Sequence, residues 1–237
     1  MNDDLQFCPA LAKLIETGET TGRSGATLKI TGLSTVNNLV VLRNLFADIA
    51  PRRTLEIGCA FGGSAILFTD SHRQTGRPPS GQHIAIDPFQ TTVWDDAALV
   101  ALENAGLRDY LDFRPQFSSV ALPGLIAEEA TFELIYIDGS HLFEDVFVDF
   151  YFATRLLTHG GIVAFDDSTD RHVKKVLRFI RTNCGFAYSA VDLGRYRADN
   201  GASLRYRAGK ALGRTQLTAF RKIGSSTREW NSAFTNF

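Results

Sequence analysis

Apolar residues in this chain form short runs separated by longer segments with a helical repeat. The runs predict buried strands at residues 55–57, 83–86, 110–114, 132–137 and 162–165. The segments between them carry apolar residues three or four positions apart. They predict helices at 64–73, 93–104 and 142–157, and a further helix whose last residues are 125–129. Strands that alternate with helices are typical of a parallel sheet covered on both faces. We therefore predict a doubly wound α/β fold.

The residues before this alternating region predict further helices. A helix at 5–16 is followed by a loop at 17–25 that is rich in Gly, Thr and Ser. Ser34 or Thr35 can cap a second helix, which ends before Pro51.

The residues after it predict an amphipathic helix at 169–182 and then two strands, 186–191 and 202–207, joined by a polar loop at 194–201. Such a hairpin would end the sheet with an antiparallel strand. We expect residues 1–34 to form an N-terminal arm or lid, 35–208 the main domain, and 209–237 a basic tail.

Charge is unevenly distributed along the chain. The net charge is −1, yet the residues from Arg195 onward carry nine Lys or Arg against Asp199 and Glu229, so they contribute +7 and the remainder −8. This segment could bind an anionic substrate or partner, or it could be a solvated face or subunit contact.

Composition narrows the class of protein. With 237 residues, of which 44% are hydrophobic, the chain can bury the core of one ordinary domain. The start of the sequence is acidic, and no apolar run approaches a membrane span. Its three cysteines, Cys8, Cys59 and Cys184, are too few and too scattered for a disulfide framework. We expect a cytoplasmic protein that does not bind membranes.

The stretch 53–68, RTLEIGCAFGGSAILF, predicts a strand, a glycine turn and a helix. A turn of this kind exposes bare backbone and helix N–H groups to a ligand, as in nucleotide-binding sites. Gly58 and Gly63 fit the dinucleotide fingerprint, but Ala60 replaces its middle glycine, which lets a pyrophosphate approach. This spacing disfavours NAD and suits a ligand with adenosine and no pyrophosphate.

Acidic residues follow closely on three predicted strands. They are Asp87, Asp138, and the pair Asp166 and Asp167. Parallel strands bring their carboxyl ends to one edge of the sheet, so we expect these acids to share a functional cleft. Asp87 ends the second strand, where a carboxylate can accept the hydroxyls of a ribose.

The sequence resembles the class I S-adenosylmethionine-dependent methyltransferases. The resemblance spans residues 35–207 and rests on the motifs LEIGCAFGGSA, IAIDPF, ENAGLRDYLDF, FELIYIDGSH and LLTHGGIVAFDDS. It implies a Rossmann-like sheet of seven strands with an antiparallel last strand. It also implies that Glu56, Gly58 and Gly62 lie along the methionine end of the cofactor, that Asp87 holds its ribose, and that Phe89 flanks its adenosine. The loop 116–119, where the family contacts adenine, lacks the acidic residue often found there.

Within this family, IDGSH followed by DD is similar to small-molecule O-methyltransferases of the macrocin type and, more distantly, of the catechol and caffeoyl-CoA types. That likeness implies Mg²⁺ held by Asp138, Asp166 and Asp167, and carboxylate oxygens are the ligands Mg²⁺ prefers. The catechol type has Asp-Asn where this chain has Asp166-Asp167.

The residues also suggest a catalytic base. A methyl acceptor must lose its hydroxyl proton, and a histidine side chain, with an ordinary pKa near 6.5, suits that transfer. His141 follows Asp138 by three residues, so we take the two as candidate catalytic residues. His141 could instead be a helix-start residue that hydrogen-bonds a carboxylate, and Asp145 could orient its ring.

Three functions stay open on the sequence alone. The first is metal-assisted methyl transfer to a hydroxyl of a small molecule such as a sugar or phenol. The second is a metal-independent methyltransferase acting on nitrogen or oxygen, and the third is a non-catalytic protein that binds the cofactor. A nucleic-acid partner is disfavoured because no recognised module accompanies the basic tail. The arm or the tail could mediate a homo-oligomer.

Overall fold

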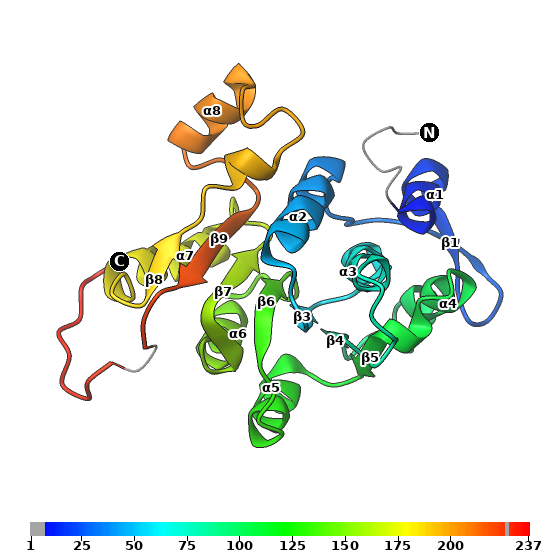
Figure 1. Ribbon diagram of the computed structural model, residues 1–237, viewed down its shortest axis with the longest axis horizontal. Coiled ribbons are helices and arrows are strands. Elements are labelled where there is room, and N and C mark those ends of the chain that lie inside the picture. Colours follow the sequence, from blue (N-terminus) through cyan, green and yellow to red (C-terminus); the bar gives the residue numbers. More distant parts are fainter. Residues whose placement is uncertain (1–7, 226–227) are drawn as a thin grey trace.

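The computed structural model describes residues 8–225 and 228–237. A seven-stranded sheet forms the centre of this part of the chain, in the order β5-β4-β3-β6-β7-β9-β8 (Figure 1). Its strands are β3 (Thr54–Ile57), β4 (His83–Ile86), β5 (Leu111–Arg114), β6 (Phe132–Ile137), β7 (Leu157–Phe165), β8 (Tyr188–Ala190) and β9 (Thr218–Lys222). The strands β3 to β7 are parallel, and β9 runs antiparallel to both β7 and β8. The Rossmann-like fold with an antiparallel last strand is confirmed.

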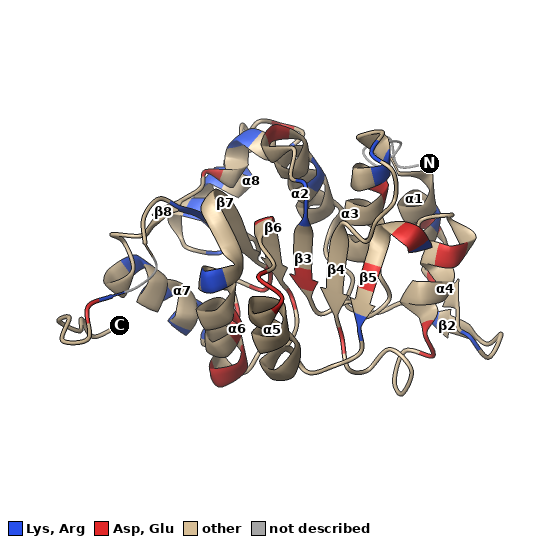
Figure 2. Ribbon diagram, turned by 60° about the horizontal axis from the view of Figure 1, so that its bottom comes forward, with Lys and Arg blue, Asp and Glu red and all other residues tan. Residues whose placement is uncertain are grey.

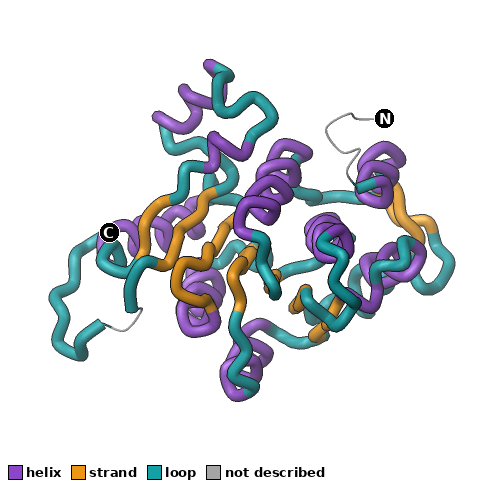
Figure 3. Tube along the Cα trace, in the orientation of Figure 1, coloured by secondary structure: helices purple, strands orange, loops and turns teal. Residues whose placement is uncertain are grey.

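Helices cover both faces of the sheet (Figures 1 and 3). One face packs against α1 (Pro9–Thr17), α2 (Val36–Ile49), α3 (Gly63–Gln74) and α4 (Ala97–Asn104), and the other against α5 (Ser118–Ala127), α6 (Phe143–Leu156) and α7 (Arg171–Asn183). Successive side chains along a strand therefore face alternate cores. In β6, Leu134 and Tyr136 face the first helix layer, whereas Ile135 and Ile137 face the second. In the described part of the chain, no helix is both long and apolar enough to cross a bilayer.

The N-terminal segment lies against the first helix layer. Residues 5–7 of the predicted helix lie outside the described residues, and α1 buries Leu11 and Leu14. The predicted loop at 17–25 is partly wrong, because β1 (Glu19–Thr21) and β2 (Thr27–Lys29) form a small hairpin there. Whether this segment acts as an arm or lid stays a prediction.

The prediction of a strand at 202–207 is wrong. These residues enter α8 (Leu204–Ala211), where the Ser203 hydroxyl accepts a hydrogen bond from the backbone N–H of Tyr206 (3.4 Å) and caps the helix. The short helix η3 (Leu193–Tyr196) precedes it, and the antiparallel partner of β8 is β9. β9 lies within the expected tail 209–237, so a boundary after residue 208 would separate a strand from its sheet.

Candidate functional site

The turn after β3 brings its backbone against the end of β6. Gly58 has a φ of +90°, and a Cβ placed on it would lie 2.2 Å from the carbonyl oxygen of Asp138. Both the backbone conformation and this close approach require glycine. Bare main chain at Gly58 therefore lines a cavity, together with Cys59 and Ala60.

This cavity, which we call the cofactor cavity, has a volume of about 590 Å³. It lies at the carboxyl ends of β3, β4 and β6, and residues of α5 and α6 complete its wall. Ligands of open α/β sheets bind at that edge, and a volume of this size suits a nucleoside-sized molecule.

Asp87 is buried at the end of β4 and lines the cofactor cavity. Its Oδ2 accepts hydrogen bonds from the backbone N–H groups of Cys59 (3.1 Å) and Ala60 (2.8 Å), and its Oδ1 accepts one from Phe89 (2.7 Å). A carboxylate offers about four acceptor positions, so Oδ1 can take a further bond from a ligand hydroxyl. The carboxylate thus also joins the two loops that form this side of the cavity.

Aromatic side chains line the same cavity. Phe89 is 45% exposed and Phe117 59% exposed, and their ring centroids lie 5.7 Å apart in an edge-to-face arrangement. Trp94 makes a similar contact with Phe61 at 5.0 Å. Exposed rings beside a cavity offer an apolar surface for a flat ligand such as a purine.

Asp149 on α6 is a further cavity residue that sequence reasoning missed. It lines the cofactor cavity with only 1% of its surface exposed, and its Oδ1 has no hydrogen-bond partner among the described residues. Burial raises the pKa of its carboxyl to about 6, against a smaller opposing effect of the Ser118 hydroxyl. From the sequence, Asp149 resembles a solvent-exposed acid on a helix surface, and only its burial in the structure distinguishes it.

Replacing Asp149 should change the pH dependence of stability. Because the folded pKa lies above the ordinary value, wild-type stability falls as pH rises from about 4 to about 6, and Asp149→Asn lacks this fall. We expect the variant without cofactor to be more stable than wild type at pH 8, by up to about 3 kcal/mol, with the difference shrinking toward pH 5. Urea denaturation at both pH values measures this. Asp109→Asn, the same change at an exposed site, should show no such difference, and equal curves for Asp149→Asn and wild type would contradict the assignment.

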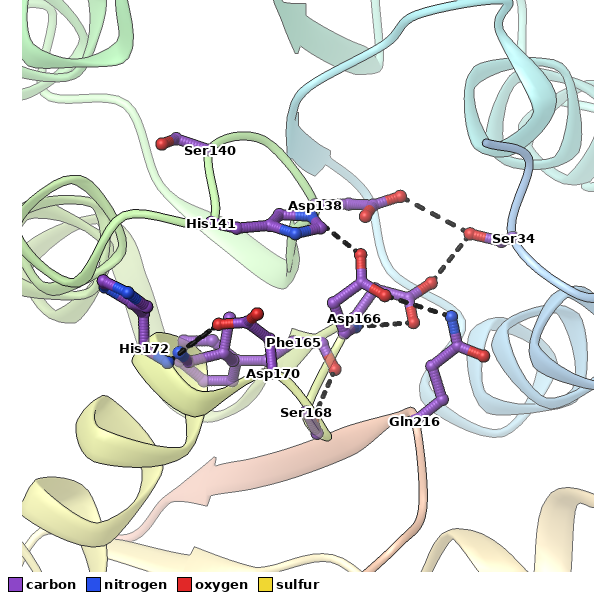
Figure 4. A network of polar contacts seen from close by, with 12 residues as sticks. Ser34, Asp138, Ser140, His141, Phe165, Asp166, Ser168, Asp170, His172 and Gln216 are labelled. Carbon is purple, nitrogen blue, oxygen red and sulfur yellow. Dashed lines mark hydrogen bonds and ion pairs between the residues drawn. The ribbon is translucent and has the colours of Figure 1, made fainter. Parts of the chain in front are cut away.

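A second group of polar residues lies where β6 and β7 end (Figure 4). Asp138 and Asp166 share the hydroxyls of Ser34 and Tyr136, with Tyr136 donating to Asp166 Oδ2 at 2.6 Å and to Asp138 Oδ2 at 3.1 Å. Burial, together with the charges of Asp166 and Asp167, raises the pKa of Asp138 well above its ordinary value. Ser34, whose neighbour Thr35 is the actual helix cap, and Tyr136 were not predicted as site residues.

His141 meets a different carboxylate of this group (Figure 4). Its Nε2 lies 2.8 Å from Asp167 Oδ2, and the Gln216 side chain donates to Asp167 Oδ1 at 3.2 Å. The imidazole keeps 53% of its side-chain surface exposed, so a solute can reach it. The prediction that Asp145 orients this ring is not supported, since Asp167 is the carboxylate in contact.

The predicted magnesium site is not formed by the described residues. No three His, Cys, Asp or Glu side chains in residues 8–225 and 228–237 are arranged to hold a metal ion. Asp166 instead accepts hydrogen bonds on both oxygens, from Ser34 and Tyr136 and from Asn38 and the Asp167 backbone. In this arrangement both oxygens of Asp166 accept hydrogen bonds, and metal binding by these acids stays a prediction.

Two of the predicted cofactor residues do not line the cavity. Glu56 is fully buried on the opposite face of β3, 3.3 Å from His83 Nε2, and neither of its oxygens has a hydrogen-bond partner among the described residues. Gly62 caps α3 with a φ of +82°, and a Cβ there would lie 2.8 Å from the Cβ of Ala98. Gly62 is thus required for packing, whereas Gly58, Asp87 and Phe89 all lie on the cavity.

Comparisons with known proteins agree with this geometry. A family model described as a methyltransferase domain matches residues 55–168. The O-methyltransferase from Bacillus cereus, solved in complex with SAH, is similar in structure at 21% identity and a TM-score of 0.59, over 77% of this chain and 82% of that one. The O-methyltransferase TomG from Streptomyces achromogenes, involved in tomaymycin synthesis and solved with SAM, is similar at 19% identity and a TM-score of 0.60. This match covers 94% of the present chain and 91% of TomG.

At these identities the solved structures establish the shared fold, and a search of curated proteins gave no significant match. The family-model match covers the glycine turn after β3 and the strand ends that carry Asp87, Asp138, Asp166 and Asp167. Residues 55–168 thus match a methyltransferase domain in sequence, and the described chain shares its fold with solved O-methyltransferases.

Proposed function

We propose that this protein transfers a methyl group from S-adenosylmethionine to a hydroxyl of a small molecule, with His141 as the general base. The contact between His141 Nε2 and Asp167 Oδ2 carries the proposal, because an imidazole held by a carboxylate is a common arrangement for removing a hydroxyl proton. Ser140 and Asp138, its near neighbours in the chain, line the cofactor cavity. The O-methyltransferase neighbours support oxygen as the acceptor atom.

The residues of the cofactor cavity would hold and orient the cofactor. Gly58 allows the ligand to lie on bare backbone, Oδ1 of Asp87 can accept a bond from a ribose hydroxyl, and Phe89 and Phe117 offer surface to the adenine. Asp149 lies beside Ser118, in the region where the family contacts adenine, and its unpartnered Oδ1 can accept a bond from the exocyclic amine. It would supply the acid that the loop 116–119 lacks.

When bound, S-adenosylmethionine supplies a methyl group on a positively charged sulfur. His141 would take the proton from the acceptor hydroxyl, so that the oxygen lone pair can form the new bond to carbon while the carbon–sulfur pair stays on sulfur. Asp167 would fix the direction of the ring and stabilise the imidazolium that forms. Asp138 lines the edge of the same cavity.

Metal assistance stays a prediction from the family resemblance. We expect the purified chain to methylate members of a panel of sugars and phenols in the presence of S-adenosylmethionine, with products identified by mass spectrometry. A parallel reaction in EDTA, with and without added Mg²⁺, separates the mechanisms. Unchanged turnover in EDTA supports proton removal by His141 alone, whereas loss of turnover that Mg²⁺ restores supports metal assistance. Cofactor binding with no methylated product across the panel would contradict the proposed function and favour a non-catalytic role.

A further inference from the structure

The basic residues of the C-terminal segment divide into two groups. Six of the nine that follow residue 194 have partners in the fold, through ion pairs with Asp48, Asp199 and Asp192 or through bonds to backbone carbonyls: Arg195, Arg197, Lys210, Arg221, Lys222 and Arg228. The other three, Arg205, Arg207 and Arg214, have no side-chain partner within the described residues. Contacts within the fold therefore account for six of these basic residues, and the role of the other three is left to explain.

Two of these three arginines line a second cavity of about 410 Å³, which we call the arginine cavity. Arg197 lines it too, held by Asp199 at 3.0 Å and stacked on the Tyr206 ring at 4.4 Å. No Asp or Glu is among the described residues that line it. Figure 2 shows basic residues on α8, on the same side of the sheet as α2. The cavity thus gathers Arg197, Arg205 and Arg214 without a carboxylate in its wall.

The start of α2 forms the opposite wall. Its cap Thr35 and its first-turn residues Asn37 and Asn38 line the cavity, and the first turn contains no acidic residue. The N-terminus of a helix carries partial positive charge and free N–H groups, so this wall adds to the attraction for an anion.

The arginine cavity adjoins the proposed catalytic residues. Asn38 donates to Asp166 Oδ1 at 3.0 Å, and Gln216 donates to Asp167 Oδ1 at 3.2 Å, and both amides line the cavity. The carboxylate that holds His141 is thus hydrogen-bonded on its other oxygen to the cavity wall. A molecule whose hydroxyl reaches His141 could extend into this space.

We propose that the arginine cavity binds an oxyanion of the methyl acceptor, a phosphate, sulfate or carboxylate group. The inference rests on the proposed function and narrows its substrate to an anionic hydroxylated molecule. Arginine presents a planar fork of N–H donors that matches the oxygens of these groups. The guanidinium groups of Arg205 and Arg214 have no partner among the residues that the structure describes, and Arg197 is already oriented by its stacking on Tyr206.

Binding of inorganic pyrophosphate to the full chain, measured by calorimetry in the presence of SAH, tests the cavity without turnover. We expect the double variant Arg205→Gln/Arg214→Gln to bind pyrophosphate at least 10-fold more weakly than wild type while SAH affinity stays the same. Arg207→Gln, on the same helix but outside the cavity, is the matched control and should bind as wild type. Unchanged binding in the double variant, or an equal loss in Arg207→Gln, would overturn the proposal.

Turnover identifies which oxyanion is used. Two acceptor pairs differ by one anionic group: catechol against 3,4-dihydroxybenzoate, which adds a carboxylate, and glucose against glucose 6-phosphate, which adds a phosphate. We expect kcat/KM to be at least 10-fold higher for the charged member of one pair, and this preference to disappear in the double variant. Equal values within both pairs would contradict an oxyanion site for the acceptor. If no acceptor is methylated, the proposed function fails, and the pyrophosphate result alone decides whether the cavity binds an oxyanion.

Discussion

Replacing Asp87 with alanine should weaken the binding of S-adenosylmethionine by about 100-fold or more. The variant loses the acceptor for the ribose hydroxyls, and hydrogen bonds to a charged group contribute about 1.5–3 kcal/mol each. It also leaves the N–H groups of Cys59, Ala60 and Phe89 without their acceptor, so the two loops beside the cavity lose their connection. Calorimetric titration with SAM and SAH measures the affinity.

Two further variants separate ligand binding from loop structure. Asp87→Asn keeps one acceptor oxygen for the backbone N–H groups but loses the negative charge, so we expect an intermediate affinity and a smaller loss of stability. Asp70→Ala removes a buried acid that binds Arg73 and Gln74, away from the cavity. It should lower the free energy of unfolding while cofactor affinity at low temperature stays near wild type. Wild-type affinity in Asp87→Ala would refute the ribose assignment.

The order of elements that builds the cofactor cavity could be predicted from the sequence because the signals there are local. The short run 55–57 followed by a glycine turn predicts a buried strand and its exit, and an acid directly after a parallel strand lies at the carboxyl edge of the sheet. For this reason the positions of Asp87, Asp138 and Gly58 follow from the pattern alone. Gly62 is also a glycine, but it is required because α4 packs closely against it, and the sequence pattern does not show this contact.

The contacts that the sequence could not predict depend on residues far apart in the chain. Ser34 reaches Asp166 across 132 positions, and Gln216 reaches Asp167 from a segment with little periodicity. The strand β9 was missed for a related reason. It buries only Ala219 and Phe220 and ends in Arg221 and Lys222, whose side chains bond carbonyl oxygens of neighbouring segments. A strand inserted between two others gains its stability from long-range pairing, which a local pattern does not record.

The metal prediction shows how a motif and its geometry can differ. Three carboxylates at neighbouring strand ends are chemically suited to Mg²⁺, yet here one of them shares hydroxyl donors with the next and the third contacts His141. The Ser34 and Tyr136 hydroxyls donate hydrogen bonds to Asp166, so these donors stabilise the adjacent acids in this arrangement. The residue types alone could not distinguish these two ways of accommodating adjacent acids.

Replacing His141 with alanine should lower kcat by about 10²–10⁴-fold, the usual contribution of a positioned general base, and leave cofactor affinity unchanged. Added imidazole should restore part of the activity, because the side chain is half exposed and its place is accessible to a solute. Steady-state kinetics with and without added imidazole measures both effects on the rate.

Asp167→Asn and His159→Ala complete this test. Asp167 has a left-handed backbone with φ +46°, which asparagine tolerates, so the substitution removes the charge beside His141 while keeping the local fold. We expect about a 10-fold loss in kcat, smaller than that of His141→Ala, because the ring loses its orientation but remains present. His159 is exposed and its ring contacts the backbone of Ile223, so His159→Ala should turn over at the wild-type rate. A kcat for His141→Ala within twofold of wild type would rule out this residue as the base and return the role to the metal-assisted alternative.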